Sequence, residues 1–143
     1  MIAIDTNVLL RYLLDDDELQ SPKAARLITG QHKVLITDVV LVETLWTLRG
    51  KKYNLDNPEL IGVIQQLFAE PNLCFEDGQT VWRALNDFRL AKPVKAGSKR
   101  KTADFPDALI VNKANYCSKP SEPLDGVYTF DLAAQQIPGA LKP

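Results

Sequence analysis

The sequence predicts an α/β fold, and more closely a three-layer α/β/α domain with a mainly parallel central sheet, as one domain over residues 1–143. Two observations predict this class. Short apolar runs, typical of strands, alternate along the chain with longer segments that have helical apolar spacing. Strands separated by helices pair in parallel, and helices then cover both faces of the sheet. The length of 143 residues and the 45% share of apolar residues suit a single domain with a substantial core.

Four apolar runs are the expected strands: IAI at 2–4, VLIT at 34–37, LCFE at 73–76 and GVYTF at 126–130. The expected helices of the first half cover 8–15, the stretch from Ser21-Pro22 to Gly30, and 38–49 before Gly50. Proline fits the first helical turn, and glycine fits the position after the last one. The expected helices of the second half cover 58–70, 77–90, 104–117 and a short segment from Asp131.

The amino-acid composition alone does not indicate a class of binding partner. The 17 Lys and Arg residues nearly balance the 18 Asp and Glu residues, so a nucleic-acid site would have to come from a local patch. No apolar run approaches the roughly 20 residues that a membrane span needs. The first residues also lack the basic stretch of a signal peptide. We therefore expect a cytoplasmic protein with no membrane partner.

Two carboxylates directly follow expected strands. Asp5 comes after IAI, and Asp131 comes after VYTF. If the strands are parallel, both side chains lie at the same rim of the sheet, where ligands bind in such folds. Asp131 could equally be only the cap of the last short helix.

Glu43 lies in the apolar stretch VVLVETLWTL. A carboxylate among apolar neighbours is costly unless it pairs with a cation or a metal ion. Two other readings stay open: an exposed helix edge, or an ion pair with an arginine such as Arg11. The two tryptophans, Trp46 and Trp82, have helical apolar spacing and are expected in the core.

Asp104 and Asp107 lie at the start of the helix at 104–117. Asp107 precedes Ile110, Val111 and Ala114 by three, four and seven residues, which places it on the core-facing side. Asp104 could simply cap this helix, with Pro106 behind it. Asp107 could likewise be an acid that the helix dipole favours.

Taken together, the carboxylates indicate a metal site. His32 is the only histidine, so the ligands would be oxygen atoms, which suit Mg²⁺ or Mn²⁺. Without a cation, mutual repulsion would raise the pKa values of converging carboxyl groups. This layout is typical of a metal-assisted phosphodiesterase.

The segments IDTNVLLRYLL, LVETLWTLR, ADFPDALI and VYTFD occur in this order and together resemble the PIN-domain family, from Asp5 to about Leu141. More closely, they resemble VapC-type ribonuclease toxins of type II toxin–antitoxin pairs. The resemblance implies catalytic, metal-binding carboxylates at Asp5, Glu43, Asp107 and Asp131. Asp104 is a companion in the motif, as a further ligand or as a helix cap. Supporting positions that orient carboxylates or waters are Thr6, Asn7 and Thr129, although Thr6 and Asn7 could also cap the first helix.

The resemblance further implies a metal-dependent endoribonuclease with Mg²⁺ or Mn²⁺ as its cofactor. The resemblance also implies products with 5′-phosphate and 3′-hydroxyl ends. Attack by a metal-activated water needs no ribose 2′-hydroxyl. The implied partners are the RNA substrate, a cognate antitoxin that occupies the acidic groove, and a second copy in a homodimer.

One segment departs from the usual family pattern. KPVKAGSKRKT at 92–102 is longer and more basic than the common form, and is expected to be a loop. Its cations could hold RNA phosphates or an acidic segment of a partner, or only be solvated: Lys92, Lys95, Lys99, Arg100 and Lys101. Arg11 is a further candidate phosphate contact.

The same residues are compared with the patterns of three other classes of protein. A phosphotransferase of the haloacid dehalogenase type would need an Asp two residues after Asp5, where the chain has Asn7. A receiver domain with Asp38 as phosphoacceptor would need an acidic pair after the first strand, which is also missing. A catalytically silent PIN scaffold that binds RNA or a partner protein stays open, as does a PIN nuclease of RNA maturation or of structured DNA.

Overall fold

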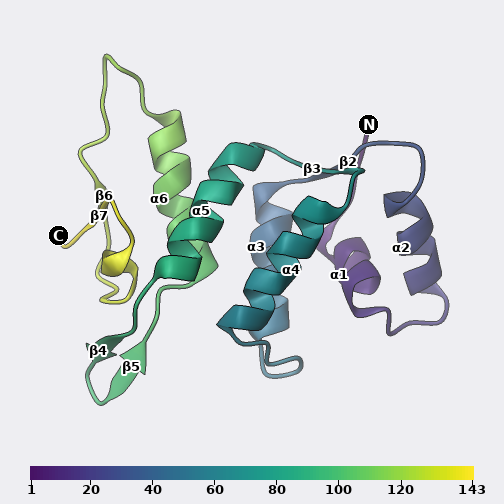
Figure 1. The fold of residues 1–143 in the computed structure, drawn as a ribbon, viewed down its shortest axis with the longest axis horizontal. Coiled ribbons are helices and arrows are strands. Elements are labelled where there is room, and N and C mark those ends of the chain that lie inside the picture. The colour runs from purple at the N-terminus through teal and green to yellow at the C-terminus, as the bar shows by residue number, and fades with distance from the viewer. The chain divides into compact units, whose positions relative to one another are not determined.

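The computed structural model describes every residue from Met1 to Pro143 (Figure 1). The chain forms two compact units, Met1–Gly78 and Gln79–Pro143. Its helices and strands alternate, and the three-stranded sheet is parallel. The predicted α/β class is therefore confirmed. No helix is long and apolar enough to cross a membrane.

The first unit contains a three-stranded parallel sheet in the order β1-β2-β3. The strands are β1 (Ile2–Ala3), β2 (Val34–Ile36) and β3 (Leu73–Phe75). Two helices follow each of the first two strands: α1 (Thr6–Leu14), α2 (Gln20–Ile28), α3 (Asp38–Arg49) and α4 (Asn57–Ala69). Each crossover between neighbouring strands therefore contains two helices. Helix α1 contacts both α2 and α3.

The core of the first unit lies between this sheet and its helices. Val34 and Ile36 of β2 are fully buried, whereas Leu35 between them is only half-buried, as the alternation along a strand requires. Each of the four helices buries at least one large aliphatic side chain, among them Leu9, Ile28, Leu41 and Leu60. The burial of these side chains fixes the position of the helix starts at the edge of the sheet.

The second unit contains α5 (Gly78–Leu90), whose first residue is the last of the preceding unit, and α6 (Phe105–Cys117). Phe88 and Phe105 pack edge to face in its core, with ring centroids 6.1 Å apart. A hairpin of β4 (Val94–Ala96) and β5 (Lys99–Lys101) joins the two helices. After α6 come β6 (Val127–Tyr128), the 3₁₀ turn η1 (Ala134–Gln136) and β7 (Ala140–Leu141), and β6 pairs with β7 in parallel.

Several expectations from the sequence are wrong in detail. The basic segment at 92–102 is mostly an antiparallel hairpin, because Gly97 and Ser98 form a two-residue turn between its strands. The strand expected at 126–130 covers only Val127–Tyr128, and its partner β7 was not expected. Trp46 and Trp82 are 60% and 48% exposed, because each lies on the outer face of its helix and not in the core.

Candidate active site

An acidic side chain follows each strand of the three-stranded sheet. Asp5 comes two residues after β1, Asp38 two residues after β2, and Glu76 directly after β3. Because the strands are parallel and in register, all three residues lie at the same edge of the sheet. This edge is where the sequence places the candidate metal site.

Asp5 is the N-cap of α1. Its backbone is extended, with φ −90° and ψ 175°, and its Oδ1 accepts a hydrogen bond of 2.9 Å from the backbone N–H of Val8. The N-cap role therefore belongs to Asp5, and the alternative of a cap at Thr6 or Asn7 is wrong. The cap uses one carboxylate oxygen and leaves Oδ2 without a hydrogen-bond donor from the protein.

Thr6 brings Glu43 to the start of α1. The Thr6 hydroxyl donates a 2.6 Å hydrogen bond to Oε2 of Glu43, across 37 residues of sequence. Glu43 is exposed, and so are its helical neighbours Val39 and Trp46, at 66% and 60%. The free-energy cost of burying a carboxylate among apolar groups therefore does not arise for Glu43. Its side chain lies on an exposed face of α3, beside Thr6, the residue that follows Asp5.

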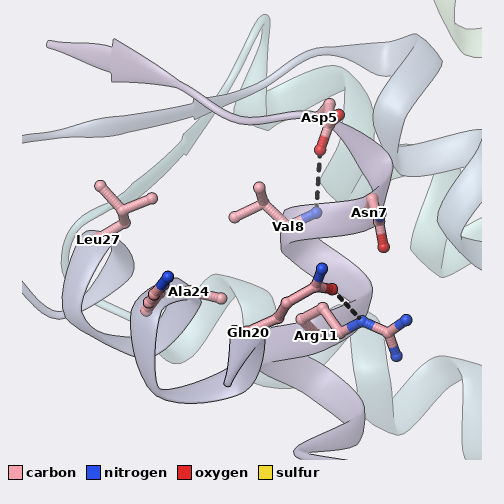
Figure 2. Close-up of a pocket in the computed structure, with 8 residues that line it drawn as sticks. Asp5, Asn7, Val8, Arg11, Gln20, Ala24 and Leu27 are labelled. Carbon is pink, nitrogen blue, oxygen red and sulfur yellow. Dashed lines mark hydrogen bonds between the residues drawn. The ribbon is translucent and has the colours of Figure 1, made fainter. Parts of the chain in front are cut away.

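Arg11 does not pair with Glu43, so that alternative is wrong. Its guanidinium NH1 forms a 3.0 Å ion pair with Asp16, and its Nε donates a 2.8 Å hydrogen bond to Gln20. The side chain lines a cavity of about 250 Å³ between α1 and α2, with Asp5 and Asn7 among the other lining residues. Figure 2 shows Arg11 held against Gln20 of α2, with Asp5 at the other end of the labelled group. A cation and the Asp5 carboxylate thus share one cavity without forming an ion pair.

Asp104 and Asp107 form a reciprocal capping box at the start of α6. The Asp104 side chain accepts the backbone N–H of Asp107, and Oδ2 of Asp107 accepts the N–H of Asp104 at 2.8 Å. Asp104 is therefore a helix cap, as one of the two readings of the sequence expected. Of the apolar residues expected to share the face of Asp107, Val111 is buried, whereas Ile110 is 58% exposed.

Asp131 lies three residues before the 3₁₀ turn η1. Its Oδ1 accepts hydrogen bonds from the N–H groups of Ala133 and Ala134, at 2.8 and 2.9 Å, and its own N–H donates to Oγ1 of Thr129 at 3.1 Å. Thr129 also lines a cavity of about 140 Å³ together with Asp107. The second unit therefore gathers Asp107, Thr129 and Asp131 in one neighbourhood.

The electrostatics of Asp107 support this grouping. Burial raises the pKa of the Asp107 carboxyl above its ordinary value, and the hydrogen bond from the Asp104 N–H partly opposes that rise. The negative charges of Asp131 and Asp104 raise the same pKa further. A half-buried carboxyl beside like charges gains stability from a bound cation, because the cation offsets both burial and repulsion.

Two carboxylates at the edge of the first sheet were not among the predicted site residues. Glu76 accepts a hydrogen bond from the backbone N–H of Asp38, which is the first residue of α3. Glu76 thus satisfies an N–H group at a helix start that has no partner within the helix. Asp38 and Glu76 share the sequence feature that indicated Asp5: each is an acidic residue within two positions of the end of a strand.

The donor set fits an oxygen-preferring divalent cation. Asp5, Glu43, Asp107 and Asp131 each use one carboxylate oxygen in hydrogen bonds from the protein and keep the other free of a protein donor. Mg²⁺ and Mn²⁺ take such oxygen ligands and keep several waters. The carboxylates form a group in each unit, and neither group alone gathers three metal-ligating side chains at coordinating separation.

A family model described as PIN domain matches residues 2–115 of this chain, which is most of its length. The match includes Asp5, Glu43, Asp104 and Asp107, whereas Thr129 and Asp131 lie beyond it. No curated protein matches the chain.

Proposed function

The chain belongs to the PIN-domain family, and from this membership we propose that it is a metal-dependent endoribonuclease, the toxin of a toxin–antitoxin pair. The PIN fold is a nuclease-type fold, so the coarse activity is hydrolysis of a nucleic-acid phosphodiester bond. The observation that carries the proposal is the Thr6 hydrogen bond, which holds Glu43 beside the residue next to Asp5. Carboxylates at all four acidic positions of the family pattern also favour an active enzyme over a silent scaffold.

In this proposal the ligands of one or two Mg²⁺ or Mn²⁺ ions, bound directly or through water, would be Asp5 and Glu43 in the first unit and Asp107 and Asp131 in the second. When bound, such an ion lowers the pKa of a coordinated water and neutralises charge on the phosphate oxygens. Each of the four side chains is already held by a protein hydrogen bond through one oxygen. A carboxylate that is fixed before the substrate arrives needs little reorganisation during the reaction.

Three neighbours act as positioning residues. The Thr6 hydroxyl orients Glu43, and the backbone N–H of Asp104 orients Asp107 through the capping box. The Thr129 hydroxyl accepts the N–H of Asp131 and so fixes the backbone from which that carboxylate projects. Hydrogen bonds of this kind to ligand residues typically contribute about 10- to 100-fold in metal affinity or activity.

The proposed substrate is RNA, and the proposed partners are a cognate antitoxin and a second copy of the chain. The resemblance to VapC-type toxins supports these assignments, and a cytoplasmic location follows from cellular RNA as the target. The carboxylate groups also suit an antitoxin that inserts a basic side chain, because an opposite charge stabilises ionised carboxyl groups.

The chemistry of the products tests this function directly. We expect RNA fragments with 5′-phosphate and 3′-hydroxyl ends, and continued cleavage of a substrate whose ribose 2′-hydroxyl at the scissile position is replaced by hydrogen. Water attack on phosphorus requires neither a 2′-oxygen nor a cyclic intermediate. End-labelling of the fragments and mass spectrometry give the measurement. Fragments with 2′,3′-cyclic phosphate ends would contradict the proposal.

A further inference from the structure

The segment around the β4–β5 hairpin concentrates positive charge. Six of the 17 basic residues and none of the 18 acidic residues fall between Phe88 and Ala103, which leaves 11 basic against 18 acidic residues elsewhere. Five of the six lie on or beside the hairpin, and all five are exposed: Lys92, Lys95, Lys99, Arg100 and Lys101. None of these five forms an ion pair in the structure. The overall charge of −1 therefore hides a strongly basic element.

The register of the hairpin determines on which of its two faces each basic side chain lies. Its three residue pairs are Val94 with Lys101, Lys95 with Arg100, and Ala96 with Lys99. The turn between the strands has Gly97 at φ +66°, the left-handed conformation that two-residue hairpin turns need and that glycine adopts without strain. Residues directly opposite one another share a face, so Lys95 and Arg100 lie side by side on one face. Both are exposed, whereas Val94 and Ala96 on the other face are half-buried.

The Lys95–Arg100 pair is unfavourable by itself. Like charges directly opposite in an antiparallel pair destabilise it, and no acidic residue lies within the hairpin to offset the repulsion. A bound anion would remove the repulsion. Arginine can hold a phosphate through two parallel N–H donors, and lysine adds a compact positive charge. The chemistry of this face therefore fits a chain of phosphate groups.

The hairpin also leads directly to the carboxylates of its own unit. Only Thr102 and Ala103 lie between Lys101 at the end of β5 and Asp104 at the start of α6, so the two residues are at most about 11 Å apart. Figure 1 shows the hairpin projecting from the end of the unit where α5 stops and α6 begins. A strand of RNA held on the hairpin would thus be close to the capping box of Asp104 and Asp107.

We propose that the β4–β5 hairpin is an RNA-binding arm, in which Lys95 and Arg100 hold phosphates of a single strand near the start of α6. This inference deepens the proposed ribonuclease function and rests on it. The fixed pairing of β4 with β5 sets Lys95 and Arg100 side by side before RNA binds, whereas Val94 and Ala96 are half-buried on the other face.

The test is binding of a labelled single-stranded RNA to the full chain in EDTA, which keeps the RNA intact, at salt concentrations from about 50 to 200 mM. The double variant Lys95→Gln/Arg100→Gln is compared with Arg26→Gln/Lys33→Gln, which removes one arginine and one lysine from exposed positions of the first unit. The hairpin variant is expected to lower the slope of log affinity against log salt by about 1.4, because each single-strand phosphate contact contributes about 0.7. The control is expected to keep the wild-type slope. Because the double variant removes the Lys95–Arg100 repulsion, its melting temperature is expected to stay unchanged or to rise. A folding defect would then not explain a loss of RNA binding.

Two results would contradict the proposal that the β4–β5 hairpin binds RNA. One is an equal change of slope in both double variants, which would mean that only overall charge matters. The other is an unchanged RNA slope together with lost binding of polyglutamate, which would assign the hairpin to an acidic protein partner. The proposed ribonuclease activity is tested separately. If the wild type binds RNA through the hairpin but does not cleave it with Mg²⁺, the RNA-binding role of the hairpin stands and the ribonuclease activity is contradicted.

Discussion

Replacement of Glu43 by glutamine is expected to lower the rate of RNA cleavage by roughly 10²- to 10³-fold, the usual effect of removing one preorganised electrostatic group. Glutamine keeps the length of the side chain, and its carbonyl oxygen can still accept the hydrogen bond from Thr6. Glu43 is exposed, so the fold is expected to stay intact. The variant therefore isolates the negative charge that the proposal assigns to metal binding.

The measurement is single-turnover cleavage of a single-stranded RNA at several Mg²⁺ concentrations. Thr6→Val is expected to lose about 10- to 100-fold, because it removes only the hydrogen bond that orients Glu43. Glu18→Gln is the matched control, since it changes an exposed glutamate of the same unit that lies outside the proposed site. Full activity in Glu43→Gln, or equal losses in it and in the Glu18 control, would remove Glu43 from the site.

Replacement of Asp107 by asparagine is expected to have opposite effects on stability with and without metal. The pKa of Asp107 is raised by burial and by the charges of Asp131 and Asp104. A raised carboxyl pKa means that the folded state binds the proton more tightly than the unfolded chain does. The metal-free wild type therefore loses stability as the pH rises from the ordinary value of 3.8 through the raised pKa. Asparagine removes this loss, so the metal-free variant is expected to be the more stable protein near pH 7.

In the same experiment, Mg²⁺ is expected to make the wild type more stable than Asp107→Asn. A ligand at 100 times its dissociation constant stabilises the folded state by about 2.7 kcal/mol. The wild type is expected to gain this stabilisation, and Asp107→Asn is expected to gain little, because it lacks one proposed ligand. Urea denaturation of both proteins from about pH 4 to about pH 7, with and without Mg²⁺, gives the measurement. Equal stabilisation of both by Mg²⁺ would contradict a ligand role for Asp107.

Local signals made the helix starts of the site predictable. Asp5 follows an apolar run and precedes a helical pattern, and Asp104 precedes Pro106 at the first turn of α6. Capping depends on residues within about one turn, which a sequence shows directly. The position of Glu76 directly after β3 was visible in the same local way, whereas its hydrogen bond to the start of α3, 38 positions away, was not.

Tertiary contacts were not predictable in the same way. The Thr6–Glu43 hydrogen bond joins residues 37 positions apart, and nothing local to either residue indicates it. The orientation of Trp46 was misjudged because α3 carries apolar residues on nearly every side, so its spacing does not define a buried face. The hairpin was missed because charged residues in β4 and β5 hid the strand pattern on either side of its Gly97-Ser98 turn.

The most direct test of the central claim is cleavage of single-stranded RNA by wild type and Asp5→Asn, each with Mg²⁺ or Mn²⁺ and then with excess EDTA. Asparagine can still accept the Val8 N–H and cap α1, so the variant removes the charge while keeping the local structure. We predict cleavage only by wild type with metal. Equal cleavage by both proteins, or cleavage by wild type that persists in EDTA, would contradict a metal-dependent ribonuclease built on Asp5.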